Sequence, residues 1–441
     1  MFETFSASDA PFFFKGFTMR FTSKQTTVAL ITQLIIFIGQ SGCVDVSTNT
    51  KNATVLKQPQ PDMPTTQNPA SPPLANLSRD NLLDLAFQIS TSIPTEPFPS
   101  DRAKMQALVA QACIKNGSLI QATQYASKIE GWRQGELFAL IGQQYATANE
   151  TQRARDFAAR AMEVATNETD WQRERIVIET AKIYLQLGDS AKVSTLLEGA
   201  TQAELGKLET ARTAIVLESQ LDNQADMFDK AIATMNFDLA RGAIEGYLVW
   251  LDRVSEDEIR TTRALKAIDD ALLGLPLDLQ VRYGVDLADH LNKNLKRDLA
   301  ILKLDKATEI FSATTFLPED VAPLGAMLAR ARIRMGDEQS ARLILQRLYS
   351  EYSTRREGIV NLRRATSLRA MAEGFCELGD RDDAIACYNL ALEEGTINPN
   401  ARPRAEDLGA TCISMAEYGI SLTPELKNRI DTIRSSLTYP W

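Results

Sequence analysis

The one histidine of this 441-residue chain is the first place to look for catalytic chemistry. Asp286 precedes His290 by four residues, a spacing that places both side chains on the same face of a helix. A carboxylate that orients an imidazole can support a general base, but such a pair also needs a nucleophile within reach. The sequence offers no nucleophile motif nearby, so we expect a surface pair. A single histidine also excludes metal sites built from several histidines.

A short acidic stretch, Asp380-Arg381-Asp382-Asp383, is a second candidate for chemistry. It matches the DxDD acid motif found in some terpene cyclases. Gly379 stands directly before it, however, and marks a tight turn between two helical segments. A polar turn accounts for these residues more simply, and we expect no catalysis there.

The cysteines show no pattern of a metal or redox site, and we expect no cofactor. None belongs to a CxxC pair, which excludes zinc-ribbon and thioredoxin-like proteins. Cys113 and Cys412 lie on apolar helical faces, where buried thiols are expected. Cys376 and Cys387 flank Gly379, and an oxidising compartment would permit a bridge. Their unequal distances from that turn stagger them beyond comfortable disulfide reach.

A local basic cluster stands in a chain whose formal net charge is −9. It consists of Arg355, Arg356, Arg363 and Arg364. The cluster could receive an acidic peptide or an anionic glycan, and the alternative is a solvated helix face. An acidic chain lacks the broad positive field that phosphate backbones require, so the charge argues against nucleic acid as a partner.

We expect residues 1–42 to contain a secretory signal peptide, although residues 1–18 do not fit its usual pattern. Arg20 and Lys24 form a basic region, and an apolar segment follows at 28–38. This segment is too short for a bilayer span, which needs about twenty residues. We expect translation to start at Met19, because a start at Met1 makes the basic region too long.

The end of this segment, Ser41-Gly42-Cys43, resembles the bacterial lipobox, where signal peptidase II cleaves and the cysteine becomes a lipid-modified N-terminus. Gln40 stands where the family usually has leucine. The resemblance implies a lipid at Cys43 and a place in the bacterial cell envelope. Val44 follows the cysteine where inner-membrane lipoproteins have aspartate, which favours the periplasmic face of the outer membrane. The alternative is an ordinary signal peptide, or an uncleaved anchor, with an incidental cysteine.

Residues 43–77 form a linker rich in proline, threonine and glutamine. They hold too few apolar side chains to offset the entropy of ordering, so we expect a disordered tether. A random-coil estimate gives it a reach of roughly 35 Å. Such a tether would hold a folded domain off the membrane, and a plain disordered terminus would look the same.

Residues 78–441 are predicted to be helical throughout. Ser78 can cap a first helix, and apolar residues recur from there at spacings of three and four. We find no convincing strand. Short turns between the helices are marked by Gly117, Gly188, Gly336 and Gly379.

One stretch, Leu368–Ala391, resembles a single tetratricopeptide (TPR) repeat. Its large residues are Leu368, Met371 and Phe375. Small residues at Ala372 and Ala384 let two antiparallel helices approach closely. The pattern recurs, and Trp132 and Trp171 occupy the same register of two successive copies.

The resemblance is strong over residues 101–200 and 325–395 and weak between them, with 205–236 and 237–273 matching poorly. It implies an all-α fold, a TPR-like right-handed α-solenoid of antiparallel helix hairpins over residues 78–441. Such arrays present an extended concave surface to proteins or peptides.

These expectations combine into a membrane-anchored, non-catalytic scaffold or adaptor of the bacterial envelope, with a protein or peptide partner on its concave face. Two alternatives stay open. One is an envelope enzyme on a helical solenoid, such as a glycan hydrolase, and the other is a purely structural spacer.

Overall fold

The computed structural model describes residues 79–198 and 218–441. These residues form eighteen α-helices and one short 3-10 helix, with no strand among them. The predicted signal peptide, Cys43, Ser78 and the linker lie outside the described residues. None of the described helices combines the length and apolarity needed to cross a membrane.

The helices follow one another along the chain with short connections. They are α1 (Arg79–Ser92), α2 (Pro99–Lys115), α3 (Leu119–Ala126), α4 (Trp132–Thr147), α5 (Thr151–Ala165), α6 (Asp170–Gln186), α7 (Ser190–Leu196), α9 (Glu218–Ala233), α10 (Phe237–Val254), α11 (Glu258–Leu273), α12 (Leu277–Lys293), α13 (Arg297–Ala313), α14 (Pro318–Arg334), α15 (Glu338–Arg355), η1 (Arg356–Gly358), α16 (Asn361–Leu378), α17 (Arg381–Thr396), α18 (Ala401–Glu417) and α19 (Pro424–Ser435).

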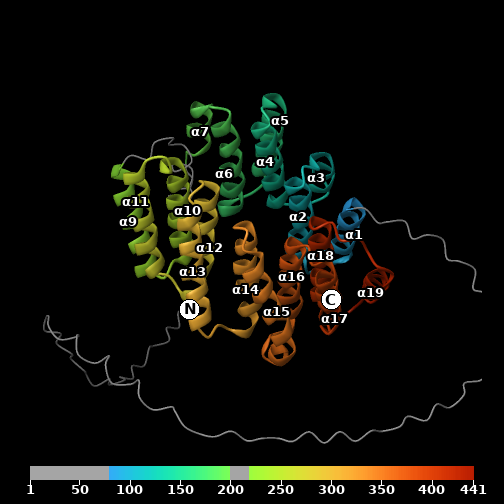
Figure 1. Ribbon diagram of the computed structural model, residues 1–441. Coiled ribbons are helices and arrows are strands. Elements are labelled where there is room, and N and C mark those ends of the chain that lie inside the picture. Colours follow the sequence, from blue (N-terminus) through green and yellow to red (C-terminus); the bar gives the residue numbers. More distant parts are fainter. Residues whose placement is uncertain (1–78, 199–217) are drawn as a thin grey trace, which may run out of the picture. The chain divides into compact units, whose positions relative to one another are not determined.

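The predicted α-solenoid is confirmed, because consecutive helices form hairpins that stack on one another (Figure 1). Helices α2, α4 and α6 pack in series, as do α10, α12, α14, α16 and α18, and we call these eight the first helices. Each packs against the helix that follows it, which we call its second helix. A hairpin in such a stack buries its apolar side only against its neighbours, so the stack shares continuous cores.

Residues with a positive φ angle end many of the first helices. Angles of 75° to 81° occur at the predicted turn residues Gly117, Gly188, Gly336 and Gly379. The turn at Gly379 closes with a hydrogen bond of 2.9 Å from Asp380 N to Phe375 O, the pattern of a left-handed helix cap. Leu295, with a φ of 61°, takes the same place between α12 and α13.

Small residues let the helices of a hairpin approach closely, as predicted. Ala154, Ala158 and Ala161 of α5 are fully buried. A methyl group on Gly142 of α4 would lie 2.6 Å from Ile183 Cδ1, closer than carbon atoms can pack. It would also lie 3.2 Å from Phe157 Cβ of α5, so a side chain at residue 142 would crowd the contacts of α4 with both α5 and α6.

The region that matches the repeat pattern poorly still packs as part of the stack. Residues 237–273 form α10 and α11, and Trp250 of α10 is only 2% exposed. Helix α14 contributes Leu324 to this core and Ala326 to the next one, so the two cores adjoin. The weak sequence match therefore does not interrupt the stack from α10 to α14.

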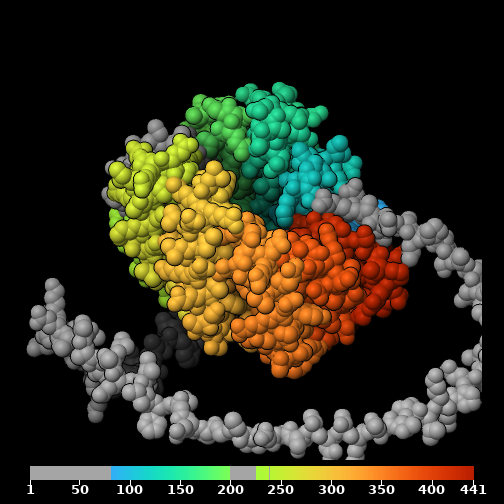
Figure 2. All heavy atoms as spheres, in the orientation of Figure 1, coloured from blue at the N-terminus to red at the C-terminus, as the bar shows by residue number. Residues whose placement is uncertain are grey.

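The two ends of the described chain pack against each other, which the sequence did not predict. Helix α1 contacts both α2 and α18, and α18 also contacts α2 (Figure 1). A methyl group on Gly409 of α18 would touch Met105 of α2 and Ile89 of α1. On the face in Figure 2, the cyan surface of the N-terminal helices meets the red surface of the C-terminal ones. We call this packing of α1 and α2 on α18 the end-to-end contact.

Candidate functional site

The histidine pair expected from the sequence is arranged differently in the structure. His290 Nδ1 lies 2.9 Å from Asp252 Oδ1 on the neighbouring helix α10. Burial raises the pKa of Asp286, and the nearby Asp289 and Glu245 add to this while His290 opposes it. His290 thus joins two adjacent first helices through Asp252 and makes no hydrogen bond with Asp286.

The acidic stretch after Gly379 also joins neighbouring hairpins. Arg342 of α15 donates two hydrogen bonds of 2.9 Å to the two carboxylate oxygens of Asp380. Asp382 and Asp383 lie in the first turn of α17, where acidic side chains interact favourably with the helix dipole. These contacts give the stretch a structural role.

The four described cysteines, Cys113, Cys376, Cys387 and Cys412, are buried and form no disulfide with one another. Burial raises the pKa of Cys376 to about 11 and that of Cys412 to about 12, and it also raises the pKa of Cys387. The bridge between Cys376 and Cys387, which their spacing argued against, is not formed. Within the described residues, no group of histidine, cysteine and acidic side chains is placed to hold a metal ion.

The predicted basic cluster is largely paired with carboxylates. Arg355 Nη2 lies 2.7 Å from Glu351 Oε2, and Arg356 Nη2 donates to Glu394 Oε2 at 3.1 Å. Arg364 is 9% exposed and donates to the Ile359 carbonyl at 3.0 Å. Arg363 is exposed. Binding of an anionic partner by this cluster stays a prediction.

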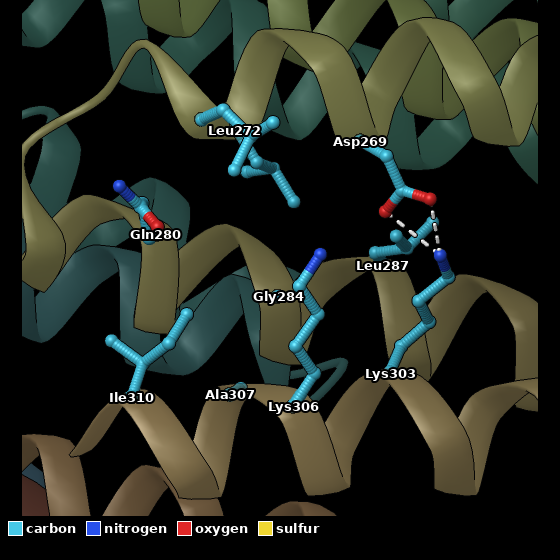
Figure 3. A pocket seen from close by; sticks show the side chains of 10 residues that line it. Asp269, Leu272, Gln280, Gly284, Leu287, Lys303, Lys306, Ala307 and Ile310 are labelled. Atoms are coloured by element: carbon cyan, nitrogen blue, oxygen red, sulfur yellow. Dashed lines mark hydrogen bonds and ion pairs between the residues drawn. The ribbon is translucent and has the colours of Figure 1, made fainter. Parts of the chain in front are cut away.

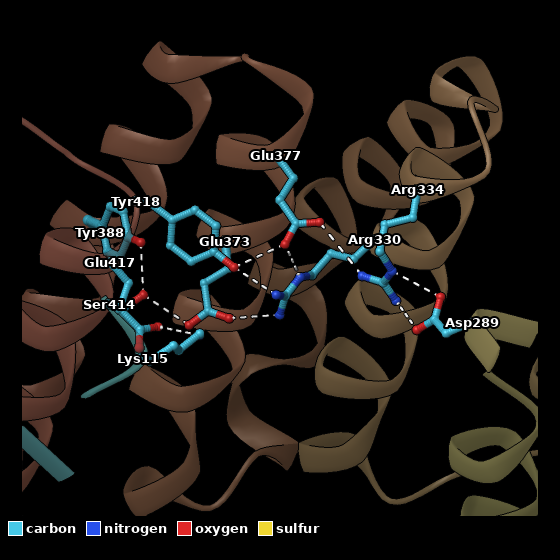
Figure 4. A network of polar contacts seen from close by, with 10 residues as sticks. All are labelled: Lys115, Asp289, Arg330, Arg334, Glu373, Glu377, Tyr388, Ser414, Glu417 and Tyr418. Atoms are coloured by element: carbon cyan, nitrogen blue, oxygen red, sulfur yellow. Dashed lines mark hydrogen bonds and ion pairs between the residues drawn. The ribbon is translucent and has the colours of Figure 1, made fainter. Parts of the chain in front are cut away.

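A network of polar side chains runs across the first helices (Figure 4). Arg330 of α14 donates to Glu377 Oε1 at 2.7 Å, to Glu373 Oε2 at 3.0 Å and to Tyr418 Oη at 2.7 Å. Burial raises the pKa of Glu373, although Arg330 opposes this. One guanidinium therefore joins α14 to α16 and to Tyr418, the residue that follows α18.

The network continues on both sides of Arg330. Arg334 Nε donates to Asp289 Oδ1 of α12 at 2.9 Å, and Lys115 Nζ of α2 lies 3.2 Å from Glu417 Oε2 of α18 (Figure 4). The second of these contacts crosses the end-to-end contact. Hydrogen bonds from the described partners satisfy these charges, so we interpret the network as a brace between hairpins.

Several contacts between neighbouring hairpins join residues at a similar sequence spacing. Ion pairs that join residues 38 or 39 positions apart are Arg175–Glu136, Arg342–Asp380, Arg356–Glu394 and Arg369–Asp407. The predicted equivalents Trp132 and Trp171 touch in a T-shaped arrangement, with ring centroids 5.1 Å apart. Other ion pairs between hairpins have different spacings, from 34 residues for Lys303–Asp269 to 47 for Arg330–Glu377, so spacing alone could not have predicted these contacts.

A crevice between α11, α12 and α13 is too small for a ligand (Figure 3). Its volume is about 20 Å³, enough for roughly one water molecule. Lys303 Nζ lies 2.6 Å from Asp269 Oδ2 at its edge. We therefore assign no binding role to this crevice.

A larger cavity of about 300 Å³ lies where α2, α4 and α6 begin. It is lined by Thr95, Pro99, Ser100, Arg102, Ala103, Gln106, Lys128, Glu130, Gly131, Trp132, Arg133 and Gln172. Three of these are basic and one is acidic, in a chain that is acidic overall. We call it the basic pocket.

The basic side chains of this pocket are held by neutral groups. The Arg133 guanidinium lies 4.2 Å from the Trp132 ring centroid, and Lys128 Nζ lies 5.6 Å from that of Phe87. Arg102 donates to the Ile93 carbonyl. Burial lowers the pKa of Arg133, although Glu136 opposes this. Cation–π contacts of this kind position a cation without neutralising it.

The basic pocket was not predicted from the sequence. In the sequence, Trp132 served only to mark the repeat register. The three cations belong to separate segments of the chain, at Arg102, Lys128 and Arg133. Their proximity depends on how α2 packs beside α4, which no local sequence pattern shows.

Comparison with known proteins gives no family for this chain. No family model matches it, and no curated protein matches it. It is similar to a solved structure described as a circular tandem repeat protein with novel repeat topology and enhanced subunit contact surfaces, at 14% identity and a TM-score of 0.23. That comparison covers 81% of this chain and 94% of the other. A TM-score this low does not establish a shared fold.

Proposed function

We propose that the protein is a non-catalytic scaffold or adaptor for protein–protein interaction, with TPR-like repeats. In this proposal a lipid at Cys43 anchors it in the bacterial cell envelope, on the periplasmic face of the outer membrane. The observation that carries the interaction role is the basic pocket, a cavity lined by three basic residues and one acidic residue on a helical repeat array. Helical arrays generally bind protein or peptide partners, and a cavity of this size gives such a partner a defined place to bind.

The basic pocket also weighs against the two alternatives. A spacer would need no cavity with charged and aromatic side chains. A glycan hydrolase needs two carboxylates on opposite sides of a scissile bond. Among the described residues, Glu130 is the one carboxylate lining the basic pocket, and in the crevice of Figure 3 the carboxylate of Asp269 is paired with Lys303.

In-cell crosslinking tests the proposal. The tagged full chain is crosslinked in cells, washed membranes are collected, and crosslinked peptides are identified by mass spectrometry. We expect one envelope protein to crosslink to the described helices. A chain that reproducibly crosslinks to no protein would contradict the scaffold role.

The anchor is tested separately by Cys43→Ala, with Ser47→Ala as a control in the predicted linker. Metabolic labelling with a fatty acid should mark the wild type and Ser47→Ala but not Cys43→Ala, and only Cys43→Ala should leave the membrane fraction. Membrane retention of Cys43→Ala would remove the anchor from the proposal and leave the interaction role intact.

A further inference from the structure

The basic pocket has the features of a specific ligand site, and we propose that it binds an acidic peptide segment of a partner protein. This inference rests on the proposed scaffold role and gives the partner's chemistry. Its charged contacts come from Arg102, Lys128 and Arg133, which belong to α2, the turn before α4, and α4.

Among the residues that the structure describes, Arg102, Lys128 and Arg133 form no ion pair with a carboxylate. Glu136 lies near Arg133 but is itself paired with Arg175. Many other described arginines pair with an acid, as Arg330 and Arg342 do. In the basic pocket, Lys128 and Arg133 instead contact aromatic rings, and Arg102 donates a hydrogen bond to a backbone carbonyl. A half-buried guanidinium outside an ion pair carries a desolvation cost, which an incoming carboxylate would offset.

Two helices begin at the same cavity. Pro99 and Ser100 begin α2, and Trp132 and Arg133 begin α4. Neither helix has a side chain that accepts a hydrogen bond from its first turn. The partial positive charge at the start of α4, whose first turn has no acidic residue, adds to that of the three side chains, whereas the first turn of α2 contains Asp101.

Among anionic ligands, the charge and the lining of the basic pocket favour a peptide. The net charge of −9 repels a long polyanion such as nucleic acid, whereas a short acidic segment meets only the local field. A sugar would favour an open aromatic face, but Arg133 covers the ring of Trp132 and Trp171 meets it in a T-shaped contact. Gln172 and the exposed backbone at Gly131 offer hydrogen bonds to an extended peptide.

Fluorescence anisotropy with the purified full chain tests this inference. The probe is a fluorescein-labelled eight-residue peptide with four acidic residues, and its control replaces them with the matching amides. We expect the acidic peptide alone to bind, and its affinity to fall as salt rises from about 0.05 M to about 0.5 M. Lys128→Gln and Arg133→Gln should each weaken binding about tenfold.

Arg363→Gln is the matched control, because it removes the same charge from an exposed arginine of the other basic cluster. Lys128 is exposed, so Lys128→Gln keeps the test valid if Arg133→Gln fails to fold. Equal binding of both peptides, or weakening by Arg363→Gln and not by the pocket variants, would overturn the inference. Inorganic phosphate or a sulfated glycan that binds the pocket as tightly as the peptide would also overturn it. If the acidic peptide does not bind but the chain still crosslinks to a protein in cells, this inference is wrong and the proposed scaffold role is unaffected.

Discussion

Arg402 Nη1 of α18 lies 2.7 Å from Asp101 Oδ2 of α2, although 301 residues separate them in the chain. This ion pair belongs to the end-to-end contact, in which α1 and α2 pack against α18. The pair is partly exposed, so the buried apolar side chains around it contribute more to stability.

Truncating a side chain in the end-to-end contact should destabilise the protein. Ile89 of α1 is 1% exposed, and its Cγ2 lies 4.0 Å from the methyl position of Gly409. We expect Ile89→Ala to lower the free energy of unfolding by about 2–5 kcal/mol, and Arg402→Ala by about 1 kcal/mol or less. Urea denaturation measures both. Ile120→Ala, at a residue 77% exposed, is the control and should change little.

Adding a methyl group at residue 142 should force α4 and α6 apart. We expect Gly142→Ala to cost about 1–3 kcal/mol, because the new carbon overlaps Ile183 Cδ1. Ile183→Val deletes that atom, so the double variant should lose less stability than the sum of the two single variants. A double-mutant cycle in urea measures this coupling. Strict additivity would show that residues 142 and 183 do not touch.

Glycine at residue 295 should stabilise the turn between α12 and α13. Leu295 is 93% exposed and has a φ of 61°, a conformation that costs non-glycine residues about 1–2 kcal/mol. Glycine relieves this strain but loses more conformational entropy on folding. We expect the relief to be the larger effect, so Leu295→Gly should raise the melting temperature modestly. The control Leu302→Gly, within α13, should lower it. A lower melting temperature for Leu295→Gly would contradict the assigned conformation.

The carboxylates of Glu373, which is partly buried, and Glu179, which is buried, should affect stability with opposite dependence on pH. Burial raises the pKa of Glu373 above its ordinary 4.5, so its contribution is fully present below pH 4.5 and is lost as the pH rises through the folded-state pKa. At Glu179, burial acts in the same direction, but Lys182 and Gln143 outweigh it and lower the pKa. That contribution is present above pH 4.5 and is lost as the pH falls through the folded-state pKa.

Denaturation of Glu373→Gln and Glu179→Gln across pH compares these contributions. The stability advantage of the wild type over Glu373→Gln should shrink as the pH rises from about 4 to about 7. Its advantage over Glu179→Gln should shrink as the pH falls from about 6 to about 3. Parallel pH profiles for the two variants would contradict the assigned directions.

The fold was predictable because its determinants are local. Gly379 marks a turn, and Ala372 and Ala384 mark a close helix pair, so each hairpin can be recognised within a few dozen residues. Trp132 and Trp171 show the repeat register through their spacing alone. The hairpin of α10 and α11 matched the pattern poorly in sequence, although the structure also gives it small buried residues, Ala243 and Ala264, beside the large Trp250.

The end-to-end contact and the basic pocket were not predictable for the opposite reason. Asp101 meets Arg402 only because the whole stack brings α2 beside α18. Likewise, the cations at Arg102 and Arg133 gather at one cavity through tertiary packing. The arginine cluster at 355–364 was visible in sequence because its residues are neighbours, whereas its carboxylate partner Glu394 lies on the next hairpin.

The end-to-end contact also imposes an order on biosynthesis. Helix α1 is synthesised early, but its partner α18 follows only after most of the chain has been made. During that interval, the side of α1 that carries Ile89 has no α18 to cover it. A chain that emerges N-terminus first, from a ribosome or through a translocation channel, therefore carries an unfinished apolar surface that a chaperone can protect until α18 arrives.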